Sequence, residues 1–163
     1  MVDFLVIGNV VAAHYSEIFP LLKEERVYLG YSISAGDRKF SVPEDYEFSG
    51  QKCGEDEEGR YVCVKGVRWF TSLFVEDKDY LVLSGSGDHQ EFDNQKIINI
   101  DSVDDIPSDF YGEMGVPITF LDKWCRRQFE IVGIADNGSG GLDMFCPRID
   151  GVGKFTRLII RRK

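Results

Sequence analysis

The sequence has 163 residues, 43% of them hydrophobic, and its 28 acidic side chains outnumber 19 basic ones to give a formal net charge of −9. This composition allows one domain with a packed core, excludes wholesale disorder, and argues against an autonomous, non-specific nucleic-acid-binding protein, which would carry a basic excess. No apolar run reaches the roughly 20 residues of a membrane-spanning helix and no secretion signal precedes the first apolar run, so we expect a cytoplasmic protein without membrane contacts.

Residues 1–35 predict a strand–helix–strand unit. Residues 3–8 form a continuous apolar run ending in glycine, which is typical of a strand buried on both faces of a parallel sheet. Residues 12–25 place apolar side chains at helical spacing, and Pro20 within them indicates a helix that is kinked or starts late. A second strand over residues 26–31 completes a unit that belongs to α/β sheets.

Residues 36–60 predict a solvated acidic loop, and residues 61–163 predict a β-rich remainder. The remainder starts with a long strand over residues 60–73, interrupted at Gly66, where a bulge would fit. One or two helical turns are expected within residues 121–128. Further strands are expected over residues 80–83, 96–100, 116–120, 129–135 and 155–161. The fold class is therefore α/β, with a β-rich mixed sheet and few helices in one domain over residues 1–163.

The cysteines and histidines do not indicate a metal site. No two cysteines have the spacing of a zinc knuckle, and neither His14 nor His89 lies in a Cys/His cluster. Cys53 and Cys63 could meet across a hairpin, but without a secretion signal free thiols are expected. The glycine clusters are interpreted as turns, because none leads into a helix whose N-terminus would hold a phosphate. These clusters are at residues 85–87, 137–141 and 151–153.

Several segments go beyond such generic patterning. The most specific is MGVPITFLDK, at residues 114–123, followed closely by QFEIVG at residues 128–133. The others are FLVIGN at residues 4–9, YSEIFPL at 15–21, YLG at 28–30, VRWFTSL at 67–73 and TRLIIR at 156–161. Together these segments resemble the EcoRI-type family of adenine-specific DNA methyltransferases, in the family's order and over nearly the whole chain.

The resemblance implies the C-terminal half of a Rossmann-like methyltransferase. Complete members transfer a methyl group from S-adenosylmethionine to the exocyclic amine of adenine, after rotating the base out of the duplex. Their cofactor loop and their Asn/Asp-Pro-Pro-aromatic tetrapeptide have no counterpart here, since no two of the five prolines adjoin. We therefore expect no catalytic residue, no bound cofactor and no activity in this chain alone.

Three origins fit such a half. The chain is a cut fragment, a subunit of a split enzyme whose other chain carries the catalytic half, or a degenerate remnant. A strand starting two residues after the initiator methionine favours a cut or a split, because a strand that belongs inside a sheet would otherwise expose an unpaired edge.

The resemblance also suggests residues that contact the target base. In related amino-methyltransferases an aromatic ring on a late strand stacks on the rotated base, roughly where Arg68, Trp69 and Phe70 stand here. Trp69 faces away from both neighbours and is favoured over Phe70, although both rings could equally belong to the core. Asn9 would lie near the mouth of the site in the whole enzyme, or would cap a helix.

Two basic clusters are candidates for contacts with DNA phosphates, and solvated surface positions are the alternative. The candidate residues in these clusters are Lys123, Arg126, Arg127, Arg157, Arg161 and Arg162. A different class of function also stays open: the acidic run over residues 44–58 could belong to an interaction or decoy protein that occupies the DNA groove of a partner enzyme.

Overall fold

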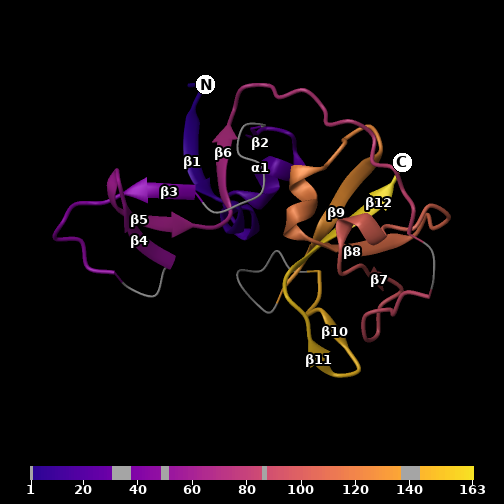
Figure 1. The fold of residues 1–163 in the computed structure, drawn as a ribbon. Coiled ribbons are helices and arrows are strands. Elements are labelled where there is room, and N and C mark those ends of the chain that lie inside the picture. The colour runs from indigo at the N-terminus through magenta and orange to yellow at the C-terminus, as the bar shows by residue number, and fades with distance from the viewer. Residues whose placement is uncertain (1, 31–37, 49–51, 86–87, 137–143) are drawn as a thin grey trace.

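The computed structural model describes residues 2–30, 38–48, 52–85, 88–136 and 144–163 (Figure 1). The strands of these residues form several small sheets, and their helices are short. The predicted β-rich fold with few helices is thereby confirmed. No helix in the described part is long and apolar enough to span a membrane. The glycine cluster at residues 137–141 and two residues of the one at 85–87 lie outside the described residues.

The N-terminal sheet has the strand order β1-β6-β2. Its strands are β1 (Leu5–Asn9), β2 (Tyr28–Leu29) and β6 (Val67–Thr71). The 3-10 helix η1 (Val10–His14) and the helix α1 (Phe19–Lys23) connect β1 to β2. Pro20 lies in the first turn of α1, where its missing N–H costs nothing, so the helix starts late rather than kinks. β6 runs antiparallel to both neighbours, and β1 and β2 are therefore parallel to each other.

β1 differs from its prediction in pairing and in burial. Its ladder partner is β6, antiparallel, and its other edge carries no strand of the described residues. Leu5, Val6 and Ile7 are 57%, 49% and 54% exposed. The apolar run did identify a strand, but within this chain that strand lies at an edge and is not buried on both faces.

A second sheet, here called the arm, comprises β3 (Arg38–Ser41), β4 (Lys52–Asp56) and β5 (Gly59–Val64) in the order β3-β5-β4. It projects to one side of the molecule (Figure 1). The predicted acidic loop over residues 36–60 thus contains two strands. At Gly66, which has a φ of +69°, the predicted long strand divides into β5 and β6, and these lie in different sheets rather than around a bulge.

The arm contains two cysteines, Cys53 and Cys63, whose positions show whether they can form a disulfide. Cys53 on β4 pairs with Val62 on β5, whereas Cys63 pairs with Lys52. Successive residues of a strand point to opposite faces, so the two thiols lie on opposite faces of the arm. Both are free, as predicted.

The C-terminal sheet has the order β7-β8-β12-β9. Its strands are β7 (Ile98–Asn99), β8 (Glu113–Pro117), β9 (Phe129–Ala135) and β12 (Arg157–Arg162). The strand predicted over residues 129–135 is confirmed. Where an extended segment was predicted to reach residue 120, β8 ends at Pro117 and η3 (Ile118–Asp122) begins. Further short elements are η2 (Val103–Asp105) and the hairpin of β10 (Arg148–Ile149) and β11 (Val152–Gly153).

The main core lies between the N-terminal sheet and the C-terminal sheet. Side chains of α1, β6, η3 and β12 meet there, among them Phe19, Phe70, Phe120 and Ile160. A second cluster covers the opposite face of the C-terminal sheet. It is formed by Phe92, Ile97, Ala135, Ile149 and Ile159. The C-terminal sheet is therefore covered on both faces by residues of this chain.

Candidate functional site

β6 carries the three predicted base-contacting residues into the centre of the N-terminal sheet. Arg68 and Phe70 share one face, and Phe70 is buried in the main core. Trp69 lies on the opposite face, where its register partner is the exposed Ile7 of β1. Trp69 is only partly buried, so of the two rings it alone keeps accessible surface.

Arg68 forms an ion pair that joins β6 of the N-terminal sheet to η3, the 3-10 helix that follows β8 of the C-terminal sheet. Its Nε and Nη2 each donate to a carboxylate oxygen of Asp122 at 2.6 Å, and its Nη1 donates to the Val67 carbonyl at 2.7 Å. Arg68 is only 4% exposed. Hydrogen bonding to Asp122 raises the pKa of the Arg68 guanidinium. The sequence analysis did not identify Asp122 as a partner, although it lies in the most specific segment, MGVPITFLDK.

A cleft of about 540 Å³ opens beside this ion pair. Residues of β2, β6, η2 and η3 contribute to its walls. Its charged lining residues are Arg68, Lys78, Asp101, Asp104, Asp122 and Lys123. Burial lowers the pKa of the Lys78 ammonium, against the attraction of Asp122. The cleft therefore presents donors and acceptors together, as a site for a polar ligand would require.

Asn9 caps the 3-10 helix after β1. Its Oδ1 accepts from the Val11 N–H at 3.0 Å, and its Nδ2 donates to the Lys65 carbonyl at 2.8 Å. The Val10 N–H also donates to the Gly66 carbonyl at 2.6 Å. The helix-cap alternative for Asn9 is confirmed, and the side chain fixes η1 against the break between β5 and β6.

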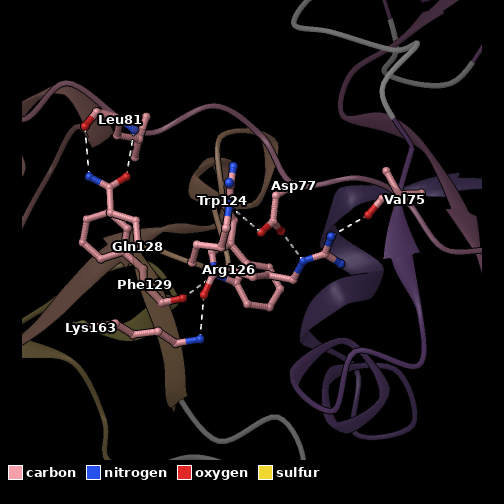
Figure 2. A network of polar contacts seen from close by, with 9 residues as sticks. Val75, Asp77, Leu81, Trp124, Arg126, Gln128, Phe129 and Lys163 are labelled. Carbon is pink, nitrogen blue, oxygen red and sulfur yellow. Dashed lines mark hydrogen bonds and ion pairs between the residues drawn. The ribbon is translucent and has the colours of Figure 1, made fainter.

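Arg126 lies at the centre of a polar network that holds the segment over residues 75–81 (Figure 2). Its guanidinium donates to the Asp77 carboxylate and the Val75 carbonyl, and its side chain is 12% exposed. It also lies 4.9 Å from the Tyr28 ring centroid and 5.5 Å from that of Phe74. Hydrogen bonds and charge from Arg126 outweigh desolvation and lower the pKa of Asp77.

Gln128 fastens the same segment at its other end (Figure 2). Its Nε2 donates to the Leu81 carbonyl at 2.9 Å, and its Oε1 accepts from the Leu81 N–H at 2.8 Å. Arg127, whose side chain is 60% exposed, lies 3.3 Å from Asp77 and 5.1 Å from the Tyr80 ring centroid. Of this basic cluster, Arg127 presents its charge to solvent whereas Arg126 is enclosed.

The other cations predicted to contact phosphates also have protein partners. The Lys123 Nζ donates to Asp104 at 2.6 Å, and both side chains are exposed. Arg157 is buried, with Asp101 and Asn99 as hydrogen-bond acceptors at 2.8 and 3.1 Å. On β12, Arg161 pairs with Glu130 and Glu113, and Arg162 donates to the Ser108 carbonyl at 2.7 Å. Their contact with DNA stays a prediction, which fits Lys123, Arg127 and Arg161 better than the enclosed Arg126 and Arg157.

The described residues contain no group of three or more His, Cys, Asp and Glu side chains placed to hold a metal ion. In the same residues no glycine-rich loop joins a strand to a helix.

Comparison with known proteins identifies the family. The profile described as adenine-specific methyltransferase EcoRI matches residues 2–163. The chain belongs to this family. It is 35% identical to the type II methyltransferase M.EcoRI of Escherichia coli over 167 residues, which cover 98% of this chain and 50% of that protein. It is 31% identical over 182 residues to the type II methyltransferase M.MpnI of Mycoplasma pneumoniae, covering 99% of this chain and 57% of the relative. No solved structure matches.

The match to M.MgeORF184P of Mycoplasma genitalium is similar in extent, at 27% identity over 183 residues and 57% of the relative. The chain thus spans about half the length of the curated relatives it matches. The segment that carries the resemblance most specifically forms β8 from Met114 onward, the whole of η3 and one wall of the cleft beside Arg68. The most family-specific segment therefore lies where the N-terminal sheet meets the C-terminal sheet.

Proposed function

We propose that this chain is the C-terminal portion of an adenine-specific DNA methyltransferase, inactive alone and completed by a catalytic half that this sequence does not contain. The complete enzyme would transfer the methyl group of S-adenosylmethionine to the exocyclic amine of adenine in DNA, in the cytoplasm. Family membership supports the reaction class, and the missing Asn-Pro-Pro-aromatic segment supports the division of labour.

The open edge of β1 is the observation that carries the proposal. Three consecutive apolar side chains there are about half exposed, and the backbone of the strand pairs on one side within the described residues. A long exposed apolar edge strand is an aggregation hazard that folded proteins normally cover. A second strand paired with β1 would complete its ladder and place side chains beside Leu5 and Ile7.

The strand order of the N-terminal sheet supports the same reading. β1 and β2 are parallel and joined through helices, with β6 inserted antiparallel between them. On its open edge, β1 could pair with a further strand parallel to it, contributed by another strand–helix unit, which is the way an open α/β sheet grows. This arrangement supports the predicted resemblance to the C-terminal half of a Rossmann-like methyltransferase.

In the completed enzyme, Trp69 is our candidate for stacking on the rotated adenine. It retains accessible surface on the face of the sheet that also carries Ile7, and Phe70 does not. Arg68 would act through structure, because its guanidinium is already engaged by both oxygens of Asp122. Lys123, Arg127 and Arg161 would supply phosphate contacts from the surface.

Co-expression tests the proposal. The chain is produced with a second polypeptide that carries the N-terminal half of a family member, and transfer of labelled methyl groups from S-adenosylmethionine to DNA is measured. We expect transfer by the mixture and none by either chain alone. A mixture that co-purifies without transfer, or two chains that never associate, would contradict the proposal.

A lysine introduced on β1 tests whether this strand is the docking surface, and a lysine introduced elsewhere is the matched control. Ile7→Lys is expected to abolish both co-purification and methyl transfer while leaving the unfolding transition of the isolated chain nearly unchanged. Val82→Lys, at a residue that is 91% exposed on the segment before residue 85, should leave both intact. If the two variants behave alike, the edge of β1 is not the docking surface.

A further inference from the structure

The hairpin of β10 and β11 carries an apolar surface that none of the roles above uses. We call residues 148–155 the tip hairpin. Val152 is 66% exposed, and Phe155, two residues before the start of β12, is 87% exposed. The hairpin projects from the body at the end away from β1 (Figure 1). A partner covering the open edge of β1 would therefore leave the tip hairpin accessible.

The tip hairpin is held rigidly by the body of the protein. Asp150 and Gly151 form its turn with φ values of 52° and 77°, the left-handed pair that matches the twist of a two-residue hairpin. The Asp93 carboxylate accepts from the N–H groups of both, at 2.9 and 2.8 Å. Ile149, directly before the turn, is buried in the second core cluster. The exposure of Phe155 thus belongs to a preorganised surface.

The tip hairpin carries two cations beside its apolar side chains. Arg148 is exposed, and its Nε contacts the Cys146 Sγ at 3.5 Å. Lys154 directly precedes Phe155 in the chain. The acidic residues at the hairpin are Asp150 in the turn and Asp93, whose carboxylate is engaged by the turn N–H groups.

We propose that the tip hairpin is a DNA-groove contact, in which the ring of Phe155 packs against bases while Arg148 and Lys154 contact the flanking phosphates. The proposal rests on the proposed function for its choice of partner. Exposed apolar side chains flanked by cations are suited to duplex DNA, because an apolar ring can be inserted between base steps from a groove while the cations contact the flanking phosphates. Val152 would pack beside Phe155 on the same surface.

Duplex binding by the 163-residue chain tests this contact. A mixed-sequence DNA duplex is titrated at low salt, with fluorescence anisotropy as the measurement. Phe155→Ala is expected to weaken binding by about tenfold or more, since contacts of aromatic rings with bases are of that size, and Phe155→Tyr should retain most of the affinity. Val82→Ala, at a residue of equal exposure elsewhere, should have no effect.

The salt dependence of binding provides a second measurement. Arg148→Gln should reduce the slope of log affinity against log salt by about one, as the loss of one phosphate contact does. Unchanged binding by Phe155→Ala would overturn the proposal, as would a wild-type chain that does not bind the duplex. If Phe155→Ala instead reduces association with the catalytic half and not with DNA, the surface is a protein interface and the proposal is wrong.

The two proposals fail separately. Methyl transfer by the reconstituted enzyme that does not depend on Phe155 would leave the proposed function standing and reject the groove contact. Conversely, DNA binding that depends on Phe155, without methyl transfer by any mixture, would support the contact and reject the methyltransferase assignment.

Discussion

The N-terminal and C-terminal sheets contain similar apolar strands, but only the C-terminal sheet is covered on both faces by the described residues. In the C-terminal sheet, Met114, Val116, Ile159 and Ile160 are completely buried, because α1 and the N-terminal sheet cover one face and the Phe92 cluster covers the other. In the N-terminal sheet, Ile7 is 54% exposed on an edge strand. The same side chain type therefore contributes to stability in one sheet and remains available for association in the other.

This difference separates folding from assembly within one chain. The C-terminal sheet is buried on both faces by residues of this chain and is expected to fold with the residues present. β1 gains only part of the free energy that burial of its side chains would provide, and a second polypeptide would supply the rest. Variants of matched chemistry in the two sheets should reveal this separation.

The largest effect is expected from a core truncation. Ile160→Ala removes a completely buried side chain between β8 and β9 and should lower the free energy of unfolding by about 2–5 kcal/mol. Ile7→Ala should cost less than about 1 kcal/mol, because solvent already reaches half of that side chain. Urea unfolding followed by circular dichroism measures both, and equal losses would contradict the contrast between the sheets.

Loss of the ion pair between Arg68 and Asp122 should lower the free energy of unfolding by almost as much. Asp122→Ala leaves the buried Arg68 without its carboxylate and should lower the free energy of unfolding by about 3 kcal/mol. Asp104→Ala breaks the exposed pair with Lys123 and should cost no more than about 1 kcal/mol. Thermal unfolding of the two variants makes the comparison, which fails if their midpoints shift equally.

The smallest effect concerns the pH dependence of the C-terminal sheet. A hydrogen bond from Asn99, followed by one from Arg157, lowers the pKa of the Asp101 carboxyl against its desolvation. The stability that Asp101 contributes is thus present above the pKa of an unfolded aspartate, about 3.9, and is lost as the pH falls through the lower folded pKa.

Asp101→Asn tests this contribution. At neutral pH the free energy of unfolding of the variant should be lower than that of the wild type by less than about 1 kcal/mol, because the carboxylate is largely exposed to solvent. The difference should shrink as the pH falls below about 4, which denaturant unfolding at several pH values would measure. A difference that stays constant with pH would assign the stability to packing instead.

The sequence predicted those elements whose patterns depend on neighbours within the chain. The mostly apolar run over residues 129–135 gives β9 at the predicted bounds, and Gly66, whose φ is positive, divides the long strand. The prediction that the run over residues 3–8 is buried on both faces was wrong for this chain, because a buried strand and an apolar edge strand can have the same composition. No pattern in one sequence distinguishes them.

The apolar run over residues 80–83 shows another limit. It was predicted as a strand, but the structure assigns no strand there, and the Gln128 amide bonds both backbone groups of Leu81 in place of a neighbouring strand. The acidic partners Asp77 and Asp122 were not predicted either. Each lies 49 or more residues from its arginine, and among 28 acidic residues sequence alone does not select them.

The insertion point of the arm has a consequence for how this family can diversify. The arm leaves after β2 and returns at β6, which are adjacent strands: the Gly30 N–H donates to the Trp69 carbonyl at 3.1 Å. Entry and exit therefore lie side by side, and closing a longer or shorter loop between them costs little free energy. Lineages can lengthen, shorten or exchange the arm as a module without disturbing the ladder that joins β2 to β6.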